Sequence, residues 1–298
     1  MEIYPKLISM YHKLMMLFFP LFLGGQSAYT VAQSTYGTGA ILEYNTPNTT
    51  KKNKIRIFGI KKKKVNYNET VPSNYSLEKF LPEIGEQGDL GSCVGWATTY
   101  YGLTIVKKIE KSNSSSVFSP LSVYNRYSFQ EKRDPCAGGA EINKCLELLK
   151  EKGSPKVTEY DMPYCAKDER KKPYSDKLLN YQRIQHNNAF QIKYYLTNDC
   201  PVVVGMMVYA GGKGNSLNSK FLDSLGVIQI DNFSNDYAVA GHALCIVGFD
   251  DNIAGGAFKI VNSWGKSWGK DGFCWIKYSD LDILKCAYAM IPRKEKSK

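Results

Sequence analysis

The stretch that decides the fold is Gln87-Gly88-Asp89-Leu90-Gly91-Ser92-Cys93-Val94-Gly95-Trp96-Ala97. Its glycines at 88 and 91 favour a tight loop. Apolar residues then recur every three or four positions, which predicts a helix from about 93 to 109. Cys93 would lie in the first turn of that helix, where the dipole and free backbone N–H groups stabilise a thiolate. A structural cysteine usually lies among apolar neighbours in mid-element, so we interpret Cys93 as a nucleophile.

A thiolate nucleophile needs a base, and the chain contains only three histidines. His12 falls in the N-terminal signal described below, and His186 lies in a polar stretch and is expected to be an exposed bystander. His242 stands at the entry of a predicted strand, 240–249. A second predicted strand ends at Asn262, whose amide could orient the imidazole. A cysteine, a histidine 149 residues later and then an asparagine fit the order of a cysteine-peptidase triad.

Four motifs then stand in order: Gln87-x5-Cys93, Cys136-Ala137-Gly138-Gly139, Gly241-His242-Ala243 and Asn262-Ser263-Trp264-Gly265-x2-Trp268-Gly269-x2-Gly272. With these motifs the sequence resembles papain-family cysteine peptidases from about Val71 to Pro292, in the manner of a bacterial exported member. The resemblance implies an α+β, papain-like two-lobed fold. A helical lobe would carry the nucleophile helix, an antiparallel β-barrel-like lobe would carry the histidine and asparagine, and the cleft would lie between them.

The resemblance also implies the catalytic roles. Cys93 would attack the scissile carbonyl as the thiolate of an ion pair with His242, which would then protonate the leaving amine. Asn262 would orient the imidazole without adding a charge. Gln87 and the Cys93 backbone N–H would bind the oxyanion, and losing one such donor typically costs about 3 kcal/mol of transition-state stabilisation.

Other positions are expected to support the site. Trp264 would cover the bond between asparagine and histidine, and simple core packing of Trp264 and Trp268 is a compatible alternative. Gly138, Gly139 and Gly241 are the expected substrate-binding positions, because glycine permits close backbone approach. The alternative for the first two is an ordinary turn before a helix predicted at 140–152.

Several positions depart from the family pattern. Val94 replaces the usual aromatic after the nucleophile, which predicts repacking with the chemistry retained. Leu90 replaces a cysteine that commonly bonds to the one matching Cys136, so that bridge cannot form. The stretch between Tyr209 and Gly241 aligns loosely, which leaves specificity open. Only about 40 residues separate the signal from Val71, so a helical inhibitory prodomain of about a hundred residues is not expected.

The N-terminus reads as a targeting signal. Basic residues precede an apolar run at 14–23, and small residues follow it. The run is too short to cross about 30 Å of hydrocarbon, although a retained anchor is the alternative. We expect a signal peptide at 1–32, a basic flexible linker or short pro-segment at 33–70, a peptidase domain at 71–292 and a basic tail at 293–298. Signal cleavage predicts a secreted or periplasmic protein without stable membrane insertion.

The net charge of +11 suggests a nucleic-acid or anionic-membrane partner at first. Residues 1–70, however, carry ten basic and three acidic side chains, and the last eight residues carry four and one. The intervening region is nearly neutral, so no nucleic-acid partner is expected.

Eight cysteines are present. Six of them could form up to three disulfides, and the sequence does not determine their pairing: Cys136, Cys145, Cys165, Cys200, Cys274 and Cys286. Cys245 lies inside an apolar strand and is the best candidate for a free thiol. No spacing resembles a zinc site, so neither metal nor cofactor is expected.

The sequence therefore predicts an exported, monomeric cysteine endopeptidase acting on peptides or proteins and open to cysteine-protease inhibitors. Two alternatives keep the fold: an aminopeptidase or transpeptidase, and a catalytically silent binding protein. The third alternative is a protein whose basic charge binds nucleic acid or membrane surfaces.

Overall fold

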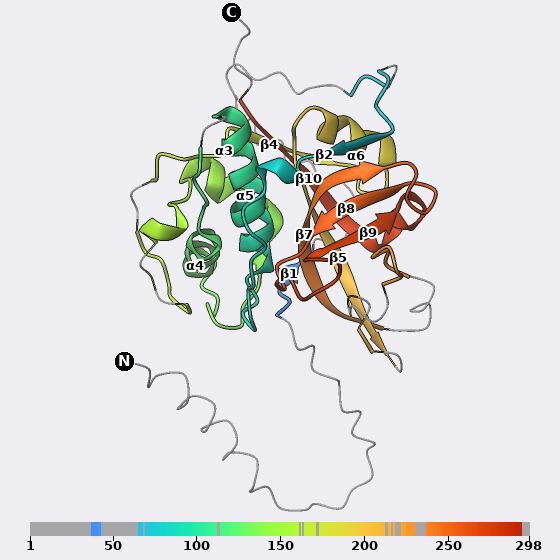
Figure 1. The fold of residues 1–298 in the computed structure, drawn as a ribbon. Helices are drawn as coiled ribbons and strands as arrows, with labels where there is room; N and C mark the ends of the chain where they lie inside the picture. Colours follow the sequence, from blue (N-terminus) through green and yellow to red (C-terminus); the bar gives the residue numbers. More distant parts are fainter. Residues whose placement is uncertain are drawn as a thin grey trace, which may run out of the picture. The chain divides into compact units, whose positions relative to one another are not determined.

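The structure, a computed structural model, describes residues 37–42 and 65–293, except 68, 112–113, 161, 163, 171–172, 212–213, 216, 218–221 and 230–236. The predicted signal peptide and most of the segment 33–70 lie outside these residues. Figure 1 shows the labelled helices α3, α4 and α5 on one side and the long strands on the other.

The helical side is organised by the helix that begins at Cys93. It starts as α2 (Cys93–Gly95), continues as the π-helical segment η2 (Trp96–Leu103) and ends as α3 (Thr104–Glu110). The predicted helix is confirmed. The π-helical turn within it has no counterpart in the apolar periodicity, which tracks only the buried face.

Two further helices pack beside the first. α4 (Pro120–Gln130) begins with a proline, whose fixed φ suits the first helical position. A Cβ at Gly95 would lie 2.2 Å from the Pro120 carbonyl oxygen, so only glycine allows this close crossing. α5 (Ile142–Glu151) buries one apolar face and turns its charged side chains outward. The prediction of a helix from residue 140 is wrong by two residues, because 140 and 141 form a strand instead.

The sheet side is one antiparallel sheet in the order β4-β10-β5-β7-β8-β9. Its strands are β4 (Asn180–Ile184), β5 (Val202–Gly211), β7 (Tyr237–Asp250), β8 (Ala257–Val261), β9 (Phe273–Lys277) and β10 (Leu284–Ile291). Two short strands extend it, since β2 (Asn74–Ser76) pairs with β7 and β6 (Gly214–Asn215) pairs with β5. The helix α6 (Ala189–Thr197) and three 3-10 turns connect these elements: η1 (Glu78–Phe80), η3 (Val157–Glu159) and η6 (Tyr278–Ile283).

The helix that begins at Cys93 packs directly on this sheet. Gly102 makes the close approach possible, because a Cβ there would lie 2.4 Å from the sulfur of Met290. The residue before it, the buried Tyr101, donates its hydroxyl to the Asn262 carbonyl at 2.9 Å. The α+β papain-like architecture is therefore present, with helix and sheet joined next to the predicted catalytic residues.

A short N-terminal strand lies between the two sides. β1 (Ala40–Ile41) runs parallel to β3 (Ala140–Glu141), with Ala40 opposite Ala140. Figure 1 shows β1 at the junction of helices and strands. This pairing joins residues a hundred positions apart in the chain, and it explains why α5 starts late.

Candidate active site

The sulfur of Cys93 is completely buried in the structure, at 0% exposure. Burial raises the pKa of the thiol to about 11, because a thiolate is poorly solvated there. Backbone N–H groups of Ala243, Val94, Ala40 and Gly39 oppose this pKa shift. The predicted start of the helix at Cys93 is confirmed, but its thiol is neutral at pH 7 in this covered state.

His242 and Asn262 are joined by a hydrogen bond of 2.8 Å between Nε2 and Oδ1. Both are buried, and burial lowers the pKa of the imidazole to about 4, with the Asn262 bond opposing the shift. Among the described residues, His242 Nδ1 has no hydrogen-bond partner. Because the amide that follows His242 in the chain lies against the Cys93 sulfur, the imidazole and the thiol belong to one site.

Trp264 covers the histidine, as expected. Its ring centroid lies 4.5 Å from that of His242 and 5.6 Å from that of Trp268. Both tryptophans are 1% exposed, so they pack in the core, and shielding of the hydrogen bond by Trp264 stays a prediction. The Trp264 indole N–H also donates to the Gly37 carbonyl at 3.1 Å.

Gln87 is held in place from three directions. Its backbone N–H donates to the Ser263 carbonyl at 2.8 Å, and its side-chain oxygen accepts from the Ser263 hydroxyl. Its Nε2 donates to the Leu90 carbonyl at 2.8 Å. A side-chain amide has two N–H donors, so one is left for an oxyanion.

The glycines of the site accept the backbone of residues 37–42. Gly39 donates its N–H to the Gly241 carbonyl at 3.0 Å and accepts from Ala140 N–H at 2.8 Å. A Cβ at Gly241 would lie 2.0 Å from the Ala40 carbonyl oxygen, and one at Gly139 would lie 2.3 Å from the Gly39 oxygen. These two predicted substrate-binding glycines thus contact an extended peptide. Gly138 is instead engaged within its own loop, where its N–H donates at 2.7 Å to Asp134.

Backbone N–H groups of the covering segment, residues 37–42, lie near the nucleophile. The amides of Gly39 and Ala40 face the Cys93 sulfur. The Gly39 carbonyl is turned away to Ala140 N–H, and the Ala40 carbonyl lies against Gly241. Residues 37–42 therefore cover the nucleophile, with the carbonyl oxygens of Gly39 and Ala40 engaged by Ala140 and lying against Gly241.

Sequence reasoning missed three contributors to the site. Tyr101 falls on the apolar face of the helix and reads as core from sequence, yet its hydroxyl bonds to Asn262. Ser263 stands inside a quoted motif, but nothing in the motif indicates its bond to Gln87. Tyr164 lies in an irregular polar stretch without any sequence signal, and its hydroxyl contacts the loop before Cys93. His186, the rejected base, lies in the turn after β4 and is partly buried rather than exposed.

One disulfide joins Cys136 to Cys165. Cys145 and Cys274, two other candidates for bridges, are buried thiols, so the upper limit of three bridges is not reached. The prediction that Cys245 is a thiol is confirmed, since it lies fully buried in β7.

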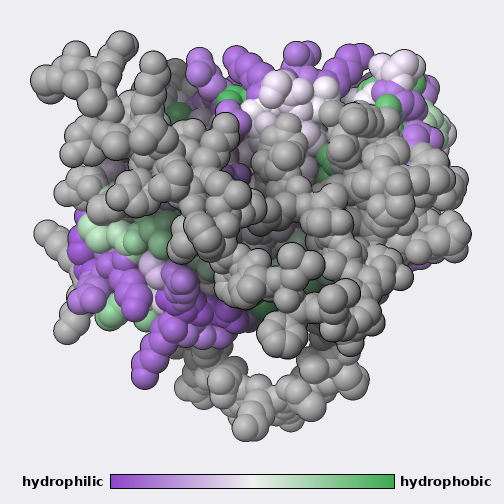
Figure 2. Space-filling model, turned by 90° about the horizontal axis from the view of Figure 1, so that it is seen from below, coloured by the Kyte–Doolittle hydropathy of each residue, from purple (hydrophilic) through white to green (hydrophobic). Residues whose placement is uncertain are grey.

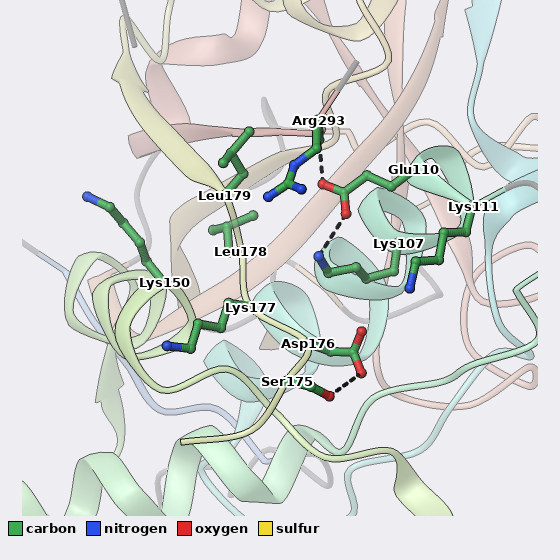
Figure 3. Close-up of a pocket in the computed structure, with 10 residues that line it drawn as sticks. All are labelled: Lys107, Glu110, Lys111, Lys150, Ser175, Asp176, Lys177, Leu178, Leu179 and Arg293. Atoms are coloured by element: carbon green, nitrogen blue, oxygen red, sulfur yellow. Dashed lines mark hydrogen bonds and ion pairs between the residues drawn. The ribbon is translucent and has the colours of Figure 1, made fainter. Parts of the chain in front are cut away.

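A separate basic pocket of about 540 Å³ shares no residue with this site. Figure 3 shows its lining, in which Glu110 binds the Lys107 ammonium at 2.7 Å and accepts the Arg293 backbone N–H. The lining residues are Lys107, Glu110, Lys111, Lys150, Ser175, Asp176, Lys177, Leu178, Leu179 and Arg293. Five of them are basic and two acidic, so the near-neutral catalytic region has a local positive patch.

On the face in Figure 2, hydrophilic side chains gather beside a smaller hydrophobic group.

Two other kinds of site are absent from the described residues. None of the helices there has the length and apolar character that a membrane crossing requires. In the same part of the chain, no three histidine, cysteine or acidic side chains cluster as metal ligands would.

The sequence is similar to several known proteins. It is 28% identical to an uncharacterized peptidase C1-like protein of Acanthamoeba polyphaga mimivirus, over 66% of this chain and 65% of that protein. The structure matches xylellain, a cysteine protease of Xylella fastidiosa, with a TM-score of 0.63, 24% identity, and 87% and 97% of the two chains covered. It also matches the Ananas comosus bromelain protease in complex with the E64 inhibitor, with a TM-score of 0.57, 17% identity, and 75% and 100% coverage.

The chain spans somewhat less than two thirds of the mimivirus relative, and likewise 63% of a Blomia tropicalis cysteine protease. The pattern of the family described as papain family cysteine protease matches residues 71–291. This match includes Gln87, Cys93, His242 and Asn262, which the fold brings to one buried site. The chain belongs to the papain family of cysteine proteases.

Proposed function

We propose that this chain is an exported cysteine endopeptidase that hydrolyses peptide bonds through Cys93 and His242. The observation that carries the proposal is the passage of residues 37–42 across the nucleophile. Residues 37–42 are an internal stretch of the chain rather than a terminus, and a site that accepts such a stretch supports cleavage within a peptide. An aminopeptidase needs the cleft closed near one end of its substrate.

The chemistry follows from the polar atoms of the site. The Cys93 thiolate attacks the scissile carbonyl carbon, and the oxyanion receives N–H bonds from Gln87 and the Cys93 backbone. The C–N bond then breaks as the His242 imidazolium gives its proton to the leaving amine. Water, deprotonated by the imidazole, hydrolyses the acyl-enzyme and restores the thiol. Asn262 keeps the imidazole oriented through both steps.

The same segment makes the covered form latent in this proposal. The pKa of Cys93 is raised to about 11 and that of His242 lowered to about 4, so neither carries its catalytic charge at pH 7. Solvent entering after the segment leaves would reverse both pKa shifts, because burial is the main cause of each. Of the two alternatives for 33–70, a short pro-segment agrees better with this placement than a linker.

Cleavage of an internally quenched peptide blocked at both ends tests the endopeptidase mode. We expect cleavage in the interior of the peptide. If only peptides with a free N-terminus are cleaved, the aminopeptidase alternative is correct. If products are formed only with an added amine acceptor, the chain is a transpeptidase.

Labelling by E64 tests whether the thiol is competent, since a solved structure of bromelain holds this inhibitor. We expect a single adduct on Cys93 once residues 37–42 are displaced. A chain that folds but takes no label and hydrolyses nothing would be a silent binding protein.

Export is tested by N-terminal sequencing of the protein from its native host. We expect a mature N-terminus after Ser27, Ala28 or Ala32, recovered outside the cytoplasm. Recovery of the full chain only inside the cell would contradict export.

A further inference from the structure

The hydroxyl of Tyr164 bridges the two ends of the loop that precedes the nucleophile. It accepts the Leu90 backbone N–H at 2.9 Å and donates to the Gln87 carbonyl at 3.0 Å. Gln87 and Leu90 are the first and fourth residues of the turn, which in an ordinary β-turn bond directly to each other. The tyrosine oxygen therefore replaces the closing hydrogen bond of this turn.

Gly88, inside the turn, has φ of +62°, a left-handed backbone conformation that glycine adopts readily. A Cβ there would be in ordinary contact with the Tyr164 oxygen, at 3.5 Å. The Gln87 side chain spans the same turn, because its Nε2 bonds to the Leu90 carbonyl. The backbone carbonyl of Gln87 is thus linked to Leu90 through the Tyr164 hydroxyl, and the side-chain amide of Gln87 is bonded to Leu90 directly. Leu90 lies three residues before the nucleophile.

A disulfide fixes the chain next to the tyrosine. Cys165 follows Tyr164 directly and is bonded to Cys136. The loop of Cys136 continues to Gly139, against which residue 39 of the covering segment lies. The Cys136–Cys165 disulfide and the two hydrogen bonds of Tyr164 therefore link the loop at 136–139 to the loop at 87–90, which carries Gln87. Both cysteines are solvent-exposed.

We propose that Tyr164 is a positioning residue that holds Gln87 in register with Cys93, and that the Cys136–Cys165 disulfide holds Tyr164 in place. This inference rests on the proposed function, because it assigns Gln87 to the oxyanion. Tyr164 touches neither the nucleophile nor the base, so it acts only through the loop. Loss of its hydroxyl should weaken stabilisation of the transition state and leave ground-state binding of the peptide intact.

The first test compares Tyr164→Phe with the unchanged chain, both in the same processed form verified by mass. We expect kcat to fall roughly five- to tenfold, the effect of about one hydrogen bond, with KM unchanged. Alkylation of Cys93 by iodoacetamide develops no oxyanion, so its rate should stay the same. Tyr181→Phe is the matched control, since it removes one hydroxyl bonded to Glu147 away from the site.

The second test is a double-mutant cycle. In a Gln87→Ala background, Tyr164→Phe should have no further effect on kcat, because the residue through which it acts is gone. Cys165→Ser should lower kcat by a similar factor and not add to Tyr164→Phe. Additive effects in these cycles would overturn the inference.

Binding of a peptide aldehyde gives the same comparison without turnover. The Cys93 sulfur adds to the aldehyde carbon and the thiol proton passes to its oxygen, which occupies the oxyanion position. We expect Tyr164→Phe to weaken this binding about as much as it lowers kcat. Equal kcat and equal aldehyde affinity in the two proteins would refute the role of Tyr164, and a parallel loss of alkylation rate would indicate general disruption of the site. If the unchanged chain neither hydrolyses peptides nor binds the aldehyde, the proposed function itself fails.

Discussion

At the scale of single residues, the site depends on which buried polar atoms have partners. His242 Nε2 is bonded to Asn262, whereas Nδ1 has no partner among the described residues. A buried ring nitrogen without a partner costs about 1–3 kcal/mol. Such a cost is expected where the nitrogen must exchange a proton with a neighbouring thiol.

Replacing Asn262 with alanine should lower kcat by about tenfold or more, because the imidazole loses the hydrogen bond that orients it. Steady-state hydrolysis of a blocked peptide measures this effect. Asn187→Ala, which removes an exposed amide bonded to Asp282 at 3.1 Å, is the control and should be neutral. Unchanged kcat in Asn262→Ala would show that orientation of the ring comes from packing against Trp264 alone.

At the scale of elements, β1 belongs to the segment that covers the nucleophile, and the latency proposed above depends on it. It is only two residues long, yet the flanking backbone bonds to Gly88, Ala140, Gly241 and Trp264. We expect its removal to admit solvent to Cys93, and to His242 in the same site. The charge states of Cys93 and His242 therefore depend on whether residues 37–42 cover the site.

Acid should favour release of this strand. The pKa of the covered His242 is about 4, whereas a solvated imidazole titrates near 6.5. The released state therefore binds more protons between these values, and release becomes more favourable as the pH falls from 6.5 to 4. We expect up to about a hundredfold more release, since one unit of pKa is tenfold.

Hydrogen exchange of the peptide containing residues 37–42 measures the release, after correction for intrinsic exchange rates. The chain would carry Cys93→Ala to prevent self-cleavage. Protection should be lower at pH 4.5 than at pH 7, and adding His242→Gln should remove most of this difference. Equal corrected protection at both pH values would contradict the coupling.

Local sequence signals predicted some elements and not others. The helix from Cys93, the strand carrying His242 and the strand that ends just before Asn262 have clear apolar patterns, and all three are present. β1 has no such pattern in Gly-Thr-Gly-Ala-Ile, because its stability comes from pairing with β3 far along the chain. Short motifs located the catalytic side chains for the same reason that they missed Tyr164, whose role arises only from tertiary contact.

At the scale of the whole domain, buried polar links support the sheet that carries the base. Lys193 on α6 is 9% exposed and binds both carboxylate oxygens of Asp251 at 2.7 and 2.8 Å. The Tyr278 hydroxyl also donates to Asp251 at 2.8 Å, and the Lys193 ammonium lies 4.7 Å from the Phe249 ring centroid. This cluster joins α6, the end of β7 and the 3-10 turn η6.

Asp251→Ala should lower the free energy of unfolding by about 2 kcal/mol, because it leaves the Lys193 ammonium buried without its carboxylate. Asp251→Asn retains an acceptor for Tyr278 and should cost less. Urea unfolding of both variants measures the difference. If the alanine variant is as stable as the unchanged chain, the ion pair does not anchor α6.

The proposed function requires the Cys93 sulfur to carry out peptide hydrolysis. The most direct measurement is hydrolysis of a doubly blocked quenched peptide by the chain freed of residues 37–42, compared with its Cys93→Ala variant. We expect cleavage by the first and loss of activity to background in the second, with the fold retained by circular dichroism. Hydrolysis that survives Cys93→Ala would show that Cys93 is not the nucleophile.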